Sequence, residues 1–247
     1  MHRALADFGL TMPQESPLTG ELQTYNRGVT MNFPRTIAAC LGLALISVAT
    51  TASAESIHAD VWVDNWFAFY LNDKKVAEDH VPITTERSFN AESFTFDAQR
   101  PFALNFIVKD YKQNDTGLEY IGTRRQQMGD GGFIAQFSGA SRKSVAVTNT
   151  DWRCLVIHNA PADPSCARER NPVAGKGPCG FTAIPEPAGW MALAFDDSAW
   201  PKATEYSARE VGPKDGYDQI RWNRDARFIW GPDLKTNNTL LCRLLVK

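Results

Sequence analysis

The stretch from Asp110 to Asp130 carries the residue types best suited to chemistry. Four side chains with hard oxygen atoms fall within ten residues, namely Asp110, Asn114, Asp115 and Glu119. Carboxylate and amide oxygens suit Ca²⁺ better than a transition metal, although the spacing is not that of an EF-hand loop. The sequence therefore predicts a calcium site built from these four residues. A solvated acidic turn is the alternative interpretation.

The same stretch offers groups that could bind an organic ligand. Tyr120 supplies a ring for stacking, and the two arginines that follow supply forked donors that fit sugar hydroxyls or a carboxylate. The alternative is a loop whose polar side chains only hydrogen-bond to one another. The predicted ligand-binding residues are Asp64, Asn65, Tyr120, Arg124, Arg125 and Asp130.

Signals for catalysis are few. Glu119 and Asp130 could form a carboxylate pair for glycoside hydrolysis, a reaction that depends on a separation the sequence does not give. The histidines His58, His80 and His158 are scattered, so a copper or zinc trio would depend on the fold. No nucleophile elbow, P-loop or dinucleotide fingerprint is present. We therefore assign no catalytic residue.

A leader precedes the region that holds these residues. Met31 to Arg35 carries one positive charge, residues 36–48 form an apolar run, and Ala52-Ser53-Ala54 ends it with small residues. This order predicts a secretory signal peptide over residues 31–54, with residues 1–30 upstream of the true start. We expect a periplasmic or secreted product that begins near Glu55, without membrane insertion after cleavage. An anchored N-terminus is the alternative.

Composition agrees with one exported domain over residues 55–247. A formal net charge of −2 gives no reason to expect binding to nucleic acid. The four cysteines after the leader predict two disulfides. Cys166 and Cys179 flank a loop rich in proline and glycine, while Cys154 and Cys242 lie in strand-like runs. A zinc site is the alternative, which no close Cys-x-x-Cys pair supports.

The elements that must position these side chains are predicted to be strands. No long helical period follows residue 55, and short β-type runs are separated by turn residues, which is typical of an antiparallel sandwich. Aromatic residues predict a strand from Trp66 to Leu71, a turn at Asn72-Asp73, and a return strand near Val76. Further strands are predicted at 93–96, 102–108, 133–137, 144–148 and 152–158.

Three segments resemble a known family. Asp64-Asn-Trp-Phe-Ala-Phe-Tyr-Leu-Asn72 resembles the "DN-x-F-x-x-Y-x-N-G" strand of galactose-binding-like jelly-roll domains, with Asp73 in place of the usual glycine. Gly189-Trp190 together with Ala194-Phe-Asp-Asp-Ser-Ala-Trp-Pro-Lys-Ala203 is similar to the "FDDSxWxxA" segment that these domains share with sugar-binding domains attached to glycosidases. Residues 226–232 and 240–246 resemble their closing strands.

The resemblance implies an all-β, antiparallel jelly-roll β-sandwich with its ligand site on loops at one end, and it makes a structural calcium an expectation. The predicted function is an exported, non-catalytic binding or accessory module whose partner is a glycan or another surface ligand. Three alternatives stay open: an extracytoplasmic metal-binding protein, a hydrolase that uses Glu119 and Asp130, and a purely structural envelope protein. Such folds carry many functions, so the fold does not decide among them.

Overall fold

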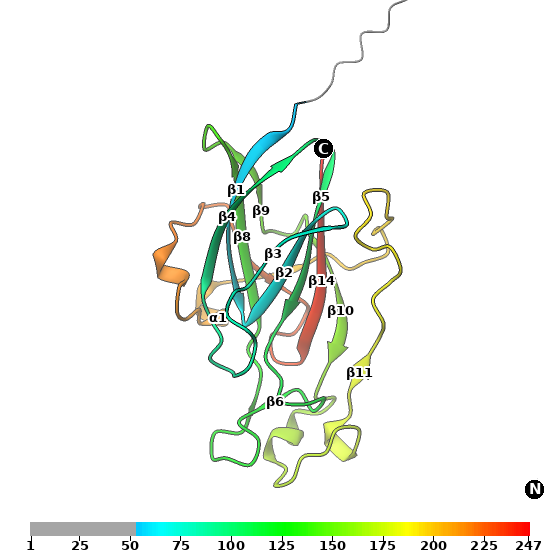
Figure 1. Cartoon of the computed structure of the whole chain (residues 1–247). Coiled ribbons are helices and arrows are strands. Elements are labelled where there is room, and N and C mark those ends of the chain that lie inside the picture. The colour runs from blue at the N-terminus through cyan, green and yellow to red at the C-terminus, as the bar shows by residue number, and fades with distance from the viewer. Residues whose placement is uncertain (1–52) are drawn as a thin grey trace, which may run out of the picture. The chain divides into compact units, whose positions relative to one another are not determined.

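The computed structural model describes residues 53–247, and almost all of the predicted leader lies outside the described residues. The described chain is nearly all β, and its strands pair antiparallel in two six-stranded sheets (Figure 1). The prediction of an antiparallel, all-β sandwich is therefore confirmed. Within residues 53–247, no helix is both long enough and apolar enough to cross a membrane.

The first sheet has the strand order β12-β13-β8-β1-β4, and β9 pairs with β8. Its strands are β12 (Thr204–Tyr206), β13 (Phe228–Trp230), β8 (Gly132–Gly139), β1 (Glu55–Asp64), β4 (Ala91–Ala98) and β9 (Ser144–Val147). The second sheet has the order β11-β10-β14-β5-β2-β3. Its strands are β11 (Thr182–Ala183), β10 (Arg153–Asn159), β14 (Asn237–Val246), β5 (Phe102–Lys109), β2 (Trp66–Leu71) and β3 (Lys74–Glu78).

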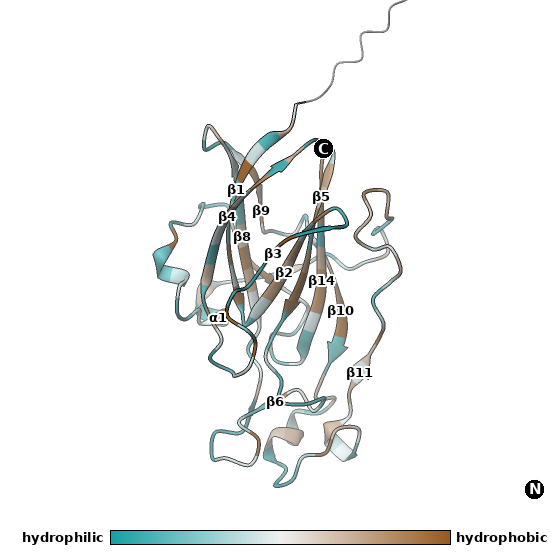
Figure 2. Cartoon of the chain, viewed as in Figure 1, coloured by the Kyte–Doolittle hydropathy of each residue, from teal (hydrophilic) through white to brown (hydrophobic). Residues whose placement is uncertain are grey.

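The main core lies between the two sheets because alternate residues of each strand point inward. Phe67 and Phe69 of β2 are fully buried there, as the alternation of this strand predicts. Phe106 of β5 stacks on Phe69 with ring centroids 4.7 Å apart, and Trp152 packs against Phe106 edge to face. Figure 2 shows the strands as largely hydrophobic and the connecting loops as largely hydrophilic. Aromatic rings thus pack directly on one another between the two layers.

The outer faces of both sheets are partly covered by long connections. Trp62 points out of the first sheet and packs with Phe228 and Val211, and its indole donates a hydrogen bond to the Asp215 carbonyl. This cover includes the helix α1 (Ala208–Val211) and the 3₁₀ turn η3 (Tyr217–Gln219). On the second sheet, Trp190 and Trp200 pack on Leu241 of β14. The protein therefore has small hydrophobic clusters outside the main core.

The segment that resembles the sugar-binding "FDDSxW" motif has a structural role. It forms turns rather than the single helical turn that Asp or Ser capping would predict. Trp200 packs against Phe195 and is 7% exposed. Asp197 forms an ion pair with Arg243, whose guanidinium is buried beneath the segment, at 2.6 Å. Burial of Trp200 and of the Arg243 guanidinium holds the segment 195–200 against the second sheet.

Both predicted disulfides are present. Cys154 and Cys242 are register partners on the adjacent strands β10 and β14. Cys166 and Cys179 join the short 3₁₀ turns η1 (Pro164–Arg168) and η2 (Gly177–Cys179). Cysteine use after the leader is thus accounted for by covalent cross-links within the fold.

The two ends of the sandwich differ in character. At one end, Arg100 donates to the Glu55 carboxylate and to the Lys247 carbonyl, each at 2.7 Å, so both termini of the domain meet there. At the opposite end lie the hairpin of β6 (Leu118–Glu119) and β7 (Gln127–Met128), with η1 and η2 beside it (Figure 1). Leu118 packs against the Cys166–Cys179 disulfide, which explains why this polar stretch is ordered.

Candidate functional site

Three aspartates meet at the end of the sandwich that carries the β6–β7 hairpin. Asp64 is the last residue of β1, Asp110 directly follows β5, and Asp130 lies two residues before β8. One carboxylate oxygen from each lies within 4.8 Å of the others. We call these three residues the acidic cluster. It takes its members from both sheets, so the sandwich itself sets their spacing.

A glycine allows the third aspartate to approach. A side chain at Gly129 would place its Cβ 1.7 Å from an oxygen of Asp110, so only glycine lets the backbone pass this carboxylate. The neighbouring Gly131 and Gly132 likewise lie against Trp230 and Val211. The Gly129-Asp130-Gly131-Gly132 stretch therefore brings Asp130 close to the other two aspartates.

Two members of the acidic cluster have buried carboxyl groups that receive no hydrogen bond from the described residues. Asp64 is 0% exposed and Asp110 is 2% exposed. None of their four carboxylate oxygens has a hydrogen-bond partner among the described residues. Buried polar groups are nearly always paired, because an unpaired one loses its hydration without compensation. These oxygens therefore point to a partner of another kind.

One lysine faces the cluster. The Nζ atom of Lys214 lies 2.9 Å from an oxygen of Asp130 and 3.6 Å from an oxygen of Asp64. It also lies 4.4 Å from the centre of the Phe89 ring. Burial lowers the pKa of Lys214, but the charges of Asp64 and Asp130 outweigh it and raise the pKa above its usual value. Lys214 therefore supplies one positive charge.

Four carboxyl groups outnumber that lysine. Burial, together with the neighbouring charge of Asp130, raises the pKa of Asp64 well above its usual value. Burial and the charge of Asp64 do the same for Asp110. Glu119, which is 2% exposed, has a pKa raised to about 7, mainly by burial. Such groups are neutralised either by protons or by a cation.

The chemistry of the donors selects the class of cation. The acidic cluster offers six carboxylate oxygens and includes neither a histidine nor a cysteine. Hard oxygen ligands suit Ca²⁺ and Mg²⁺, and Ca²⁺ accepts the larger number and the more flexible arrangement. Asp64, Asp110 and Asp130 therefore fit a calcium ion, which would replace the protons on the buried carboxyl groups.

A pocket of about 270 Å³ opens beside the cluster. Glu119 lines it and accepts a hydrogen bond from Gln127 at 2.9 Å. Lys214 and Tyr120 lie on its wall, together with residues of the 86–89 segment. A small polar ligand in this pocket would lie next to both the glutamate and the lysine.

The structure brings together only some of the residues predicted from the sequence. Asp64, Asp110 and Asp130 lie in the cluster, with Glu119 in the adjoining pocket. Asn114 instead accepts a hydrogen bond from the backbone of Thr116. Asp115 pairs with Lys112 at 2.5 Å and contacts His158 at 3.2 Å. Asn114 and Asp115 therefore lie outside the acidic cluster.

The other predicted ligand-binding residues have local partners or face solvent. Asn65 is fully buried, and it accepts from the Tyr111 backbone at 2.6 Å and donates to the Glu86 carbonyl. The Arg125 guanidinium lies 4.4 Å from the centre of the Tyr120 ring. Arg124 is exposed on the same loop. Asn65 thus connects the backbone at Tyr111 to the backbone at Glu86. Of Asn65, Tyr120, Arg124 and Arg125, only Tyr120 lines the pocket beside the acidic cluster.

The three histidines do not form a common site. His58 contacts Asp60, His80 contacts Glu92, and His158 contacts Asn238. Within residues 53–247, the second possible metal-binding group is Asp79, His80 and Glu92. In that group His80 is exposed, Glu92 is half-buried and Asp79 is buried. A trio of histidines is absent from both groups found in the described part of the chain.

Lys214 is the member of the site that sequence reasoning misses. It follows α1 in the segment Val211-Gly-Pro-Lys214, far along the chain from the aspartates. No periodicity or spacing connects it with them. Its position depends on the way Trp62 anchors the 207–228 connection to the first sheet.

Searches against protein-family models, curated proteins and solved structures found no match to this chain.

Proposed function

We propose that this chain is an extracytoplasmic binding module of the galactose-binding-like jelly-roll kind, with a calcium ion in the acidic cluster and a carbohydrate as its ligand. The observation that carries the proposal is the pair of buried carboxylates of Asp64 and Asp110, which have no hydrogen-bond partner within residues 53–247. A Ca²⁺ ion between them and Asp130 would supply the missing partner. It would also fix the relative positions of the three chain segments that carry these aspartates, next to the adjoining pocket.

Two features support an extracytoplasmic compartment, the leader-like sequence and the disulfide cross-links. Disulfides persist in oxidising compartments and are rare in the cytosol. Two of them join residues of this domain. Together with the leader-like sequence at residues 31–54, they support a periplasmic or secreted location. Millimolar calcium is compatible with a site of moderate affinity in such surroundings.

Calcium binding is tested by thermal unfolding and by titration calorimetry of the chelator-treated domain. We expect Ca²⁺ to raise the Tm, because at 100 times the Kd a ligand of the folded state adds about 2.7 kcal/mol. Asp110→Asn should abolish both the heat of binding and the Tm increase. Asp115→Asn, in the same loop but outside the cluster, is the matched control and should retain both. Absence of calcium binding by the unaltered domain would refute the proposed ion.

The carbohydrate ligand is tested separately with a glycan array, run with calcium and again with a chelator. Binding that disappears on chelation would tie the ligand to the calcium-organised loops. Binding that is unaffected by chelation would separate the sugar from the ion. A lack of binding under both conditions would remove the carbohydrate from the proposal.

A hydrolase is the second candidate, and the environment of Glu119 favours it. A carboxyl group with a pKa near 7 that lines a pocket is suited to general acid catalysis. If the domain hydrolyses oligosaccharides, we expect the rate of hydrolysis to fall at least about 100-fold in Glu119→Gln. A factor of about 100 is the lower end of what a general acid contributes. Reducing-end assays measure this, with Glu86→Gln on the same pocket as the control. If the unaltered protein hydrolyses no oligosaccharide, the hydrolase hypothesis is refuted.

A further inference from the structure

A second pocket lies on the outer face of the first sheet, away from the acidic cluster. The connection that covers this sheet packs on Trp62, and its residues 219–223 then form one wall of the pocket above the preceding outward residues of β1. The pocket has a volume of about 550 Å³, within the range of small-molecule sites. We call it the face pocket. Its floor is formed by His58 and Asp60 of β1 and by Gln136 and Ser138 of β8.

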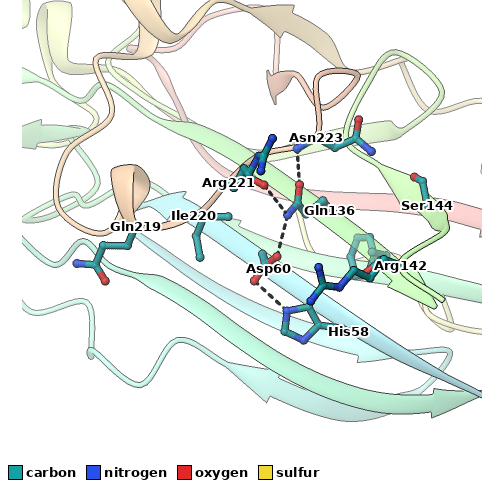
Figure 3. Close-up of a pocket in the computed structure, with 11 residues that line it drawn as sticks. His58, Asp60, Gln136, Arg142, Ser144, Gln219, Ile220, Arg221 and Asn223 are labelled. Carbon is teal, nitrogen blue, oxygen red and sulfur yellow. Dashed lines mark hydrogen bonds and ion pairs between the residues drawn. The ribbon is translucent and has the colours of Figure 1, made fainter. Parts of the chain in front are cut away.

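The floor is held rigid by hydrogen bonds, as Figure 3 shows. Asp60 accepts from Gln136 at 2.8 Å, from Ser93 at 2.6 Å and from His58 at 3.2 Å. Gln136 in turn accepts from the Asn223 backbone at 2.5 Å. Because β1 and β8 are register partners at these residues, the side chains lie side by side. The polar groups are therefore positioned before any ligand arrives.

Two arginines flank this floor without partners. Arg142 comes from the turn between β8 and β9, and Arg221 comes from the connection that follows η3. Within the described residues, neither guanidinium makes a hydrogen bond or an ion pair, and both remain exposed. The Arg221 carbonyl accepts from Gln136, which anchors its backbone at the pocket edge. Two unpaired positive charges thus face one pocket of a protein whose net charge is negative.

The chemistry of the ligand follows from this arrangement. A guanidinium binds a carboxylate through two parallel hydrogen bonds, so the arginines select an anion. The pocket is far larger than a single inorganic anion, and its remaining polar groups can bind hydroxyls. Ile220, which is partly exposed at the pocket, adds apolar surface against which a sugar ring can pack. These properties together describe a sugar that carries a carboxylate.

We propose that the face pocket binds an acidic saccharide of the uronic acid class, with its carboxylate between Arg142 and Arg221. Its hydroxyl groups would meet Ser138, Ser144 and the His58–Asp60 pair on the floor. The proposal shares a carbohydrate ligand with the proposed function but uses none of the residues of the acidic cluster. Failure of one therefore leaves the other standing.

The test is titration calorimetry of the whole domain with trigalacturonate in EDTA, with neutral galactotriose as the matched ligand. We expect binding of the uronide, no binding of the neutral sugar, and weaker binding as salt increases. Arg142→Gln and Arg221→Gln should each weaken binding about tenfold or more, since each removes charge-assisted hydrogen bonds. Arg224→Gln, on the same connection but outside the pocket, should leave the affinity unchanged.

Further probes separate the uronide from other anions. Uronide binding in EDTA that depends on both arginines supports the face pocket even if calcium never binds to the domain. The proposal would be overturned if both arginine variants bound the uronide as tightly as the unaltered domain does. A preference for the neutral sugar would overturn it as well. Binding of inorganic phosphate or a sulfated disaccharide in place of the uronide would overturn the carboxylate assignment. No binding of trigalacturonate at millimolar concentration would also overturn it.

Discussion

In cation-free buffer, the domain is expected to lose stability as the pH rises from about 4.5 to 7. The pKa of Glu119 is raised from 4.5 to about 7 in the folded state. The folded state therefore holds its proton when the unfolded state has released it, and the free energy of unfolding falls with pH in that window. The loss from this residue is about 3 kcal/mol. Burial raises the pKa values of Asp64 and Asp110 as well, so these two groups add to the loss as the pH rises.

Urea denaturation at a series of pH values measures this loss. Saturating Ca²⁺ should remove it, because the ion stabilises the ionised carboxylates that burial disfavours. Glu119→Gln should make the cation-free curve less steep between pH 4.5 and 7, since this side chain no longer titrates while Asp64 and Asp110 still do. Stability that rises with pH over this window, in the absence of metal, would show that the buried carboxyl groups have other partners.

Loss of Asp197 is the second change for which we expect a large effect. The Arg243 guanidinium is 2% exposed and donates to Asp197, to the Ala192 carbonyl at 2.9 Å and to the Leu193 carbonyl at 3.2 Å. Asp197→Ala would leave a buried cation without its counter-ion. Removing one partner of a buried pair costs about 3–5 kcal/mol. Guanidinium chloride denaturation should show a loss of this size.

A double variant tests the cause of that loss. Asp197→Ala combined with Arg243→Met replaces the buried charge by an apolar side chain of similar length. We expect it to recover most of the stability, because apolar replacement of a buried ion pair is often neutral. If the double variant were less stable than Asp197→Ala, packing by the arginine stem would be the dominant contribution instead.

The strands were predictable because their residues act locally. Alternation in Trp66–Leu71 and the Asn72-Asp73 turn predict β2 and β3, and the cysteines lie where they can pair. The strand β1 was harder to recognise. It runs directly on from the small residues that end the predicted leader, and Asp64, expected before an aromatic strand, is instead the final residue of β1. A segment buried on both faces lacks the alternation that would mark its limits.

The candidate site was predictable only in part because it is assembled over long separations. Closeness along the chain suggested that Asp110 would act with Asn114 and Asp115. The sheets instead bring Asp110 to Asp64 and Asp130, which belong to other strands. The face pocket combines side chains from two strands, a turn and a distant connection, so no spacing in the sequence indicates it. Both sites depend on sheet register, which only the folded structure gives.

The position of the chain ends has a practical consequence for any measurement on this domain. Arg100 ties Glu55 to the Lys247 carbonyl, and Asp64 lies at the far end of the ten-residue strand β1 that starts at Glu55. Ten residues of strand span about 30 Å. A tag or a sensor surface attached after Lys247 is thus held a full strand length away from the aspartates. Immobilised protein would present its acidic end outward, towards whatever is passed over it.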